Sequence, residues 1–282
     1  MSIKPVVKWV GGKRQLLDKI TDLMPSNVGI DFALDGNRLY VEPFVGSGAL
    51  WLDLQPKNAI INDKNKELMN MYRVVRDDPR RFLDALKSHA ANNSRDYYYS
   101  VRAWDRDPNF TEMPDWKRAA RFLYLDKAGY GGMYRVNKNG KYNTAYNAHP
   151  PKDMVNEAGI LALHDYLRRN NIDIRCGDYA DTLAGIPVDS FVYLDPPYSP
   201  ISKTANFTHY TAARFDYVQQ ERLRDECVKL RDRGIPFIES NSDTPAIREL
   251  YKDFTLSTVQ AWRTIAAKRI HCQTAAELLI TA

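Results

Sequence analysis

The residues best suited to chemistry in this sequence begin at Asp195, which is followed by two prolines and Tyr198. The apolar run at 190–194 predicts a buried strand, and the strand must end there because proline donates no ladder hydrogen bond. Ligands of open α/β sheets bind at such carboxyl ends. The carboxylate and the turn carbonyls accept hydrogen bonds, and Tyr198 offers a stacking face. This corner suits a planar group bearing NH2, such as adenine or cytosine; the plain alternative is a turn in which Asp195 caps a neighbour.

A second candidate binding element is a predicted strand–turn–helix–strand unit. The strand at 39–44 leads into Gly46 and Gly48, and a second strand at 58–62 ends at Asp63. Two glycines at a strand-to-helix turn let a ligand approach the backbone, and an acid after the second strand can hold ribose hydroxyls. The pattern predicts a nucleoside site. Because the third glycine of the dinucleotide fingerprint is missing, it favours a smaller ligand than a dinucleotide.

Near the start, Trp9 precedes a Gly-Gly-Lys sequence that ends at Lys13. It only superficially resembles a phosphate loop, because Val7 stands where the Walker pattern needs another glycine. A Gly-Gly turn that opens a helix can still place Lys13 near a carboxylate or phosphate. Taken alone, Trp9 is better explained as a core aromatic than as a binding residue.

Composition predicts an ordinary globular protein of 282 residues, with 44% hydrophobic and 27% charged residues. The sequence has no run of eighteen apolar residues and no secretory leader pattern, so we expect a cytoplasmic protein without a membrane partner. Its three cysteines are far apart and include no C-x-x-C pair. This spacing argues against a zinc site and a disulfide framework, and we expect no metal.

Positive charge is concentrated between residues 102 and 141, where nine basic and five acidic residues leave +4 of the chain's net +5. Seven aromatic residues lie in the same segment. Interleaved basic and aromatic residues are typical of nucleic-acid surfaces, although a solvated helix face over a small core would look similar. Runs at 133–136 and 141–146 around an Asn-Gly turn predict a β-hairpin whose exposed face carries Arg135, Asn137, Lys138 and Lys141. A two-stranded ribbon fits a DNA major groove, where arginine prefers guanine.

The remaining elements predict an α/β fold. Strands at 172–176 and 235–240 alternate with helices at 157–170 and 217–233, and runs at 254–262 and 277–281 predict an antiparallel close to the sheet. Residues 94–150 interrupt this pattern as an inserted, mainly helical module with the hairpin. Residues 200–215 are polar and without periodicity, which predicts a mobile lid.

In their joint order these motifs resemble the Dam-type, D12 class of DNA adenine N6-methyltransferases, and the match runs from one end of the chain to the other. The motifs are Lys8-Trp9-x-Gly-Gly-Lys13, Phe44-x-Gly46-x-Gly48, Asp63, the hairpin Tyr134-Arg135-x-Asn137-x-x-Gly140-x-Tyr142-Asn143, Cys176-x-Asp178-Tyr179, Asp195-Pro-Pro-Tyr198, Ala205-Asn206-Phe207-Thr208-x-Tyr210 with Phe215 and Gln220, Ser240-Asn241, and Glu277-Leu278-Leu279-Ile280-Thr281.

The resemblance implies a Rossmann-like methyltransferase sheet, with a catalytic domain at 1–93 and 151–282 and a target-recognition module at 94–150. It implies S-adenosyl-L-methionine as methyl donor and S-adenosyl-L-homocysteine as product. Asp195 and the Pro196 carbonyl would accept the two N–H bonds of the target amine, and Tyr198 would stack on the base. The implied cofactor contacts are Trp9, Lys13, Phe44, Gly46, Gly48, Asp63, Asp178, Tyr179 and Asp195. The sulfonium methyl is already activated, so the reaction requires no metal.

The implied partner is double-stranded DNA, from which the target adenine must flip out. The implied DNA contacts are Lys8, Tyr130, Met133, Arg135, Asn137, Lys138, Asn206 and Tyr210, the last two in a loop that closes over the base. GATC or a shorter or degenerate relative is the expected site. Three departures from the family pattern fall in the recognition module, at Asp126-Lys127, Gly131 and Ala145, so relaxed specificity stays open; a fourth is Ser242.

Two other functions stay open. The first is methyl transfer to a different amino group, which would make the protein an N4-cytosine DNA methyltransferase or an RNA adenine methyltransferase. The other is a catalytically silent nucleic-acid-binding relative, which the intact Asp195 motif and glycine turn speak against. The biological role stays open between restriction–modification, regulation and phage protection. The sequence indicates no obligate protein partner.

Overall fold

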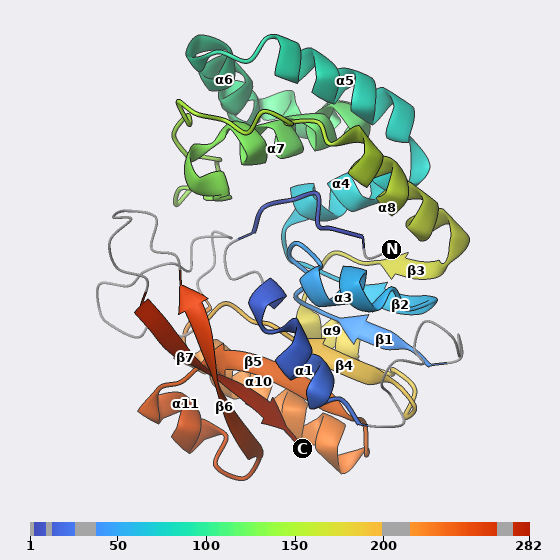
Figure 1. The fold of residues 1–282 in the computed structure, drawn as a ribbon, viewed down its shortest axis with the longest axis vertical. Coiled ribbons are helices and arrows are strands. Elements are labelled where there is room, and N and C mark those ends of the chain that lie inside the picture. Colours follow the sequence, from blue (N-terminus) through green and yellow to red (C-terminus); the bar gives the residue numbers. More distant parts are fainter. Residues whose placement is uncertain (1–2, 10–12, 26–37, 199–214, 264–272) are drawn as a thin grey trace.

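The computed structural model describes residues 3–9, 13–25, 38–198, 215–263 and 273–282. They form a seven-stranded sheet in the order β3-β2-β1-β4-β5-β7-β6, with helices on both faces (Figure 1). The strands are β1 (Tyr40–Glu42), β2 (Asn58–Ile61), β3 (Asn171–Ile174), β4 (Phe191–Leu194), β5 (Phe237–Ser242), β6 (Thr255–Arg263) and β7 (Gln273–Thr281).

Strands β1 to β5 run parallel, and β7 runs antiparallel to both β5 and β6. This confirms the predicted Rossmann-like sheet with an antiparallel close. The chain builds outward from β1 through β2 to β3, then returns to lay β4 against the other edge of β1, where Tyr40 pairs with Phe191. The carboxyl ends of β1 and β4 are therefore neighbours at the topological switch point, where such sheets bind ligands.

Local sequence explains where many helices begin. Asn65 caps α4 by accepting hydrogen bonds from the backbone of Glu67 and Leu68, and Pro79 at the first turn of α5 separates it from α4. The α-helices are α1 (Leu17–Asp22), α3 (Ala49–Leu54), α4 (Lys66–Asp77), α5 (Pro79–Ala91), α6 (Arg95–Arg102), α7 (Asp115–Ala128), α8 (Glu157–Arg169), α9 (Tyr179–Leu183), α10 (Tyr217–Asp232) and α11 (Pro245–Leu250); short 3-10 turns are η1 (Lys13–Gln15), η2 (Ala103–Arg106), η3 (Pro108–Glu112) and η4 (Tyr130–Gly132). None of the described helices is both long and apolar enough to cross a bilayer.

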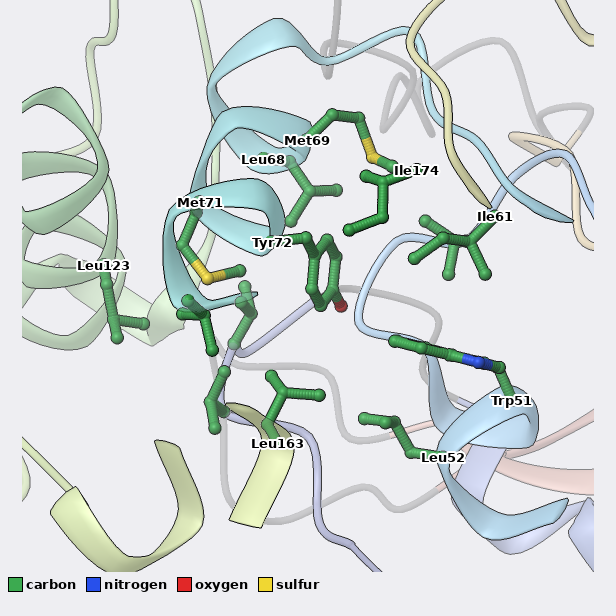
Figure 2. Close-up of a cluster of buried hydrophobic side chains, with 14 of the residues drawn as sticks. Trp51, Leu52, Ile61, Leu68, Met69, Met71, Tyr72, Leu123, Leu163 and Ile174 are labelled. Atoms are coloured by element: carbon green, nitrogen blue, oxygen red, sulfur yellow. The ribbon is translucent and has the colours of Figure 1, made fainter. Parts of the chain in front are cut away.

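The core consists of two buried clusters on opposite faces of the sheet. Along β4, Tyr193 belongs to one cluster, whereas Val192 and Leu194 belong to the other. This alternation follows the two-residue period of a strand, so a strand covered on both faces is apolar throughout. Figure 2 shows the larger cluster, where Trp51 and Tyr72 meet side chains from α4, α8 and the ends of β2 and β3.

Residues 94–150 contain α6, α7 and the short turns η2 to η4. Helix α7 lies beside α4 and α5 (Figure 1), and its Phe122 joins the same buried cluster as Leu68 of α4. The division into a catalytic domain and an inserted module stays a prediction, because the packing runs continuously across it.

The predicted hairpin is only partly formed. The chain reverses at its turn, where the Gly140 amide donates to the Asn137 carbonyl at 2.9 Å, but two isolated bridges replace the expected strands, one of them between Val136 and Tyr142. Side chains take up acceptors of the second run. The Asn143 amide donates to the Arg135 carbonyl at 2.9 Å, but the Asn143 carbonyl accepts from the Arg135 guanidinium at 3.3 Å. The Tyr142 amide points away from Val136 and donates to the carboxylate of Asp105 at 2.8 Å.

Candidate active site

Asp195 directly follows β4, and its carboxylate forms an ion pair with Lys13. The two atoms, Lys13 Nζ and Asp195 Oδ1, are 2.8 Å apart, and the side chains are 5% and 22% exposed. Burial raises the pKa of Asp195 to about 6, and the charge of Lys13 opposes that rise. The carboxylate is therefore mostly ionised at neutral pH.

Tyr198 is fixed from two sides. Its hydroxyl donates to Glu277 Oε2 at 2.7 Å, and the ammonium of Lys13 lies 4.5 Å from the centre of its ring. Glu277 comes from β7, opposite Ser242 of β5. The aromatic face predicted beside Asp195 is thus held by a residue distant in the sequence.

A buried polar network supports the Pro-Pro turn. The Gln220 side-chain amide donates to the Pro197 carbonyl at 3.2 Å, and the Asn241 amide donates to both Gln220 Oε1 and Glu239 Oε1 at 2.9 Å. Gln220, Asn241 and Glu239 are fully buried. The thiol of Cys227 donates to Glu239, whose pKa burial raises to about 7. Because each member has a partner, the network holds the turn rigidly.

The glycine bend follows β1. Gly46 and Gly48 have φ values of 47° and 69°, which favour glycine. The Gly46 amide donates to Asp63 Oδ2 at 3.2 Å, and Asp63 Oδ1 accepts from the Asn65 amide at 2.8 Å. Burial raises the pKa of Asp63 to about 6, against these backbone donors. Trp9 covers the bend so closely that a Cβ at Gly46 would lie 2.7 Å from its Cδ1.

Three aromatic rings gather beside this bend. The centre of the Phe44 ring lies 5.1 Å from that of Tyr179 and 5.9 Å from that of Phe215. Asp178 accepts two hydrogen bonds from Arg222 at 2.8 and 2.9 Å, which lowers its pKa. The Arg222 guanidinium also lies over the Tyr179 ring, 4.9 Å from its centre. An apolar aromatic cluster with a carboxylate at its edge offers the contacts that a heteroaromatic ring prefers.

The structure thus brings Trp9 to Gly46, Lys13 to Asp195 and Phe44 to Tyr179, while their roles stay predictions. Pro196 is buried in the turn after β4. Sequence reasoning gave no role to four residues that hold the site: Arg222, Gln220, Asn241 and Glu277. One signal was available, because β5 ends in a run of polar residues where a buried strand should be apolar.

Six of the candidate DNA contacts lie within the described parts of the chain. Tyr130 is 50% exposed, Met133 is half-buried, and Lys8, Arg135, Asn137 and Lys138 are exposed. Arg135 donates from Nε to Asn143 Oδ1 at 2.8 Å. Asn206 and Tyr210, with most of the predicted lid, fall outside the described residues, as do the two glycines before Lys13. No group of three or more potential metal-ligating acids, histidines or cysteines occurs within the described parts of the chain.

Comparison with known proteins identifies the family of this chain. The D12 class N6 adenine-specific DNA methyltransferase family matches residues 9–265. The type II methyltransferase M1.LlaDCHI of Lactococcus lactis subsp. cremoris is 38% identical over 281 residues, covering 100% of this chain and 96% of that protein. The type II methyltransferase M.MjaIII of Methanocaldococcus jannaschii is 36% identical, covering 95% and 94%. The DNA adenine methylase of Escherichia coli K12 is 34% identical over 263 residues, covering 93% and 88%. The chain therefore belongs to the D12 class of N6 adenine-specific DNA methyltransferases.

Proposed function

We propose that this protein transfers a methyl group from S-adenosyl-L-methionine to the N6 atom of an adenine flipped out of duplex DNA, within GATC or a related site. The observation that carries the proposal is the placement of an ionisable acid, Asp195, at the end of β4, beside the glycine bend at the end of β1. An amine acceptor and a nucleoside-sized bend then share one edge of the sheet.

The chemistry of the target explains the need for this corner. The N6 lone pair of adenine is delocalised into the ring, so the amine is a poor nucleophile. Asp195 and the Pro196 carbonyl accept hydrogen bonds from its two N–H groups. These bonds localise the lone pair and stabilise the positive charge that develops on nitrogen. Lys13 fixes the carboxylate, and the Gln220 network fixes the turn, so little reorganisation accompanies the reaction.

The described residues fit the cofactor. The bend at Gly46 carries no side chain and lies under the Trp9 ring, Asp63 can accept from ribose hydroxyls, and the rings of Phe44, Tyr179 and Phe215 suit an adenine. When bound, S-adenosyl-L-methionine supplies a sulfonium-activated methyl group.

Duplex DNA is the proposed partner of the exposed turn at 130–138. Arg135 would read a guanine, Lys8 and Lys138 would approach phosphates or base edges, and the exposed ring of Tyr130 would contact a base. The module at 94–150 would thus carry sequence recognition, and the remainder would carry chemistry.

Methyl transfer from labelled S-adenosyl-L-methionine to duplex DNA, single-stranded DNA and RNA, followed by identification of the methylated nucleoside, tests the proposal. We expect N6-methyladenine in duplex DNA and a loss of at least about 100-fold in Asp195→Asn, which keeps the side chain's shape. N4-methylcytosine, or preference for RNA, would replace the proposal with the corresponding alternative. If no methyl group is transferred to any of these nucleic acids, the remaining hypothesis is a catalytically silent nucleic-acid-binding protein.

A further inference from the structure

One aromatic side chain, Trp9, touches both the cofactor bend and the segment proposed to read DNA. Its ring stacks on Tyr134, with centroids 5.8 Å apart and planes inclined by 22°. Its indole edge also covers Gly46, where an added Cβ would lie 2.7 Å from Cδ1 and 2.9 Å from Nε1. A single ring therefore separates Tyr134 from the backbone of the bend.

Tyr134 is firmly set within the recognition segment. It stands between Met133 and Arg135, two of the proposed DNA contacts. Its ring packs against Phe122 of α7 at 5.3 Å and against Tyr142 at 5.4 Å. A displacement of the turn that carries Arg135 must therefore move the Tyr134 ring or break this packing.

Lys8, the residue before Trp9, is held by the same module at 94–150. The Lys8 amide donates to Asp126 Oδ2 of α7 at 2.8 Å, and the Lys8 side chain packs over Gly132, where φ is 61° and a Cβ would collide with it. Residues 8 and 9 thus contact the module at 94–150 at three points: Asp126, Gly132 and Tyr134. The path from the DNA-reading turn to the bend is one continuous chain of packed groups.

From this path we infer that Tyr134 is a positioning residue that, through Trp9, couples DNA binding at the recognition turn to cofactor binding at Gly46. The inference rests on the proposed function. Coupling of this kind is reciprocal, so DNA must tighten the binding of the cofactor by the same factor as the cofactor tightens the binding of DNA. The Trp9–Tyr134 stack can carry this coupling because packed interfaces change between discrete arrangements and do not deform continuously. A shift of the recognition turn therefore changes the packing at the bend.

The test uses S-adenosyl-L-homocysteine as a non-reacting probe and measures its Kd by calorimetry, with and without the duplex that the protein methylates. In the wild type we expect the duplex to tighten binding by roughly 5-fold or more. Tyr134→Phe, which keeps the stack, should retain this factor, and Tyr134→Leu should lose most of it. Tyr146→Leu is the matched control, because the Tyr146 ring lies in the same segment but packs on Tyr98 at 5.3 Å.

If Tyr134 has only a structural role, the expected result differs. Tyr134→Leu would then raise the Kd of S-adenosyl-L-homocysteine by the same factor with and without DNA, and the ratio of the two Kd values would not change. That result would overturn the inference, as would a wild type whose affinity does not respond to DNA. Both outcomes are distinguishable from failure of the proposed function, which the methylation assay reports first. Should Tyr134→Leu fail to fold, amide exchange in the wild type decides, because the duplex alone should slow exchange across residues 44–48 and unchanged exchange would refute the coupling.

Discussion

The ammonium of Lys13 and the carboxylate of Asp195 lie 2.8 Å apart at the edge of the sheet, although one residue precedes the first strand and the other follows the fourth. The ion pair opposes the effect of burial on Asp195 and orients its carboxylate. The protonation state of the proposed catalytic acceptor therefore depends on Lys13, which lowers the pKa of Asp195, and on Glu277, which raises it.

Removing that charge should shift the pH dependence of methylation. Burial raises the pKa of Asp195 to about 6 and Lys13 lowers it, so Lys13→Met should raise it further. The proposed reaction needs ionised Asp195, so the acid limb of the kcat–pH profile should move to higher pH. The variant should lose more activity at pH 6.5 than at pH 8.5. Lys19→Met, on the exposed face of α1, is the control, and an acid limb identical to the wild type would contradict the assignment.

Cutting the network under the Pro-Pro turn should lower kcat and stability together. Gln220→Leu leaves the Pro197 carbonyl and the Asn241 amide without their partner, which costs about 1–3 kcal/mol when the groups are buried. We expect a lower Tm and a fall in kcat larger than any change in KM for DNA. Gln219→Leu, one position earlier on α10, controls for helix effects. Equal kcat in both variants would show that the network does not position the turn.

Asp63 should matter for the cofactor and not for DNA. Asp63→Ala removes the acceptor of the Gly46 and Asn65 amides, so the bend loses its anchor. The Kd for S-adenosyl-L-homocysteine should rise about tenfold or more, equivalent to about 1.4 kcal/mol, while the Kd for duplex DNA without cofactor stays near that of the wild type. Calorimetry and DNA titration measure the two separately. Asp173→Ala, an exposed acid on β3, should change neither, and an equal loss for both ligands in Asp63→Ala would argue for a structural effect alone.

Arg135 should determine sequence preference. In the structure its guanidinium donates to Asn143, so it is already oriented at the exposed turn. Arg135→Ala should reduce discrimination at one guanine by about 1–3 kcal/mol, measured as methylation rates on duplexes with single base-pair changes. Lys138→Ala should instead weaken all duplexes alike and reduce the salt dependence of binding. If both variants keep the wild-type preference, another residue reads the base.

The buried acid of β1 should make stability fall as pH rises. Glu42 is 2% exposed, accepts a hydrogen bond from the Tyr40 hydroxyl at 2.6 Å, and has a pKa that burial raises to about 8. The folded state therefore binds more protons than the unfolded state between pH 4.5 and 8, and the stability contributed by the neutral acid is lost across that range. Glu42→Gln should reduce the difference in Tm between pH 5 and pH 9. A variant with the same difference would show that other groups govern this slope.

Local patterns explain what the sequence predicted well. Apolar runs that end near Gly46 or at the prolines after Asp195 predict a strand and the place where it ends, and Pro79 predicts the boundary between two helices. These predictions succeed because each depends only on residues that are neighbours in the sequence. The hairpin prediction was incomplete for the opposite reason. The Asn143 carbonyl accepts from the Arg135 side chain, and the outward-facing Tyr142 amide donates to Asp105, which is far away in the sequence. The contacts of Arg222 with Asp178 and of Glu277 with Tyr198 join distant segments, and periodicity carries no information on such pairs.

The position of the antiparallel strand β7 has a consequence for how the protein folds during synthesis. Glu277, which receives the hydroxyl of Tyr198, becomes available only when β7 has inserted between β5 and β6. A polypeptide whose β7 is still inside the ribosome can form the parallel half of the sheet but lacks this anchor for the aromatic face. The aromatic face beside Asp195 is therefore completed only after β7 has joined the sheet.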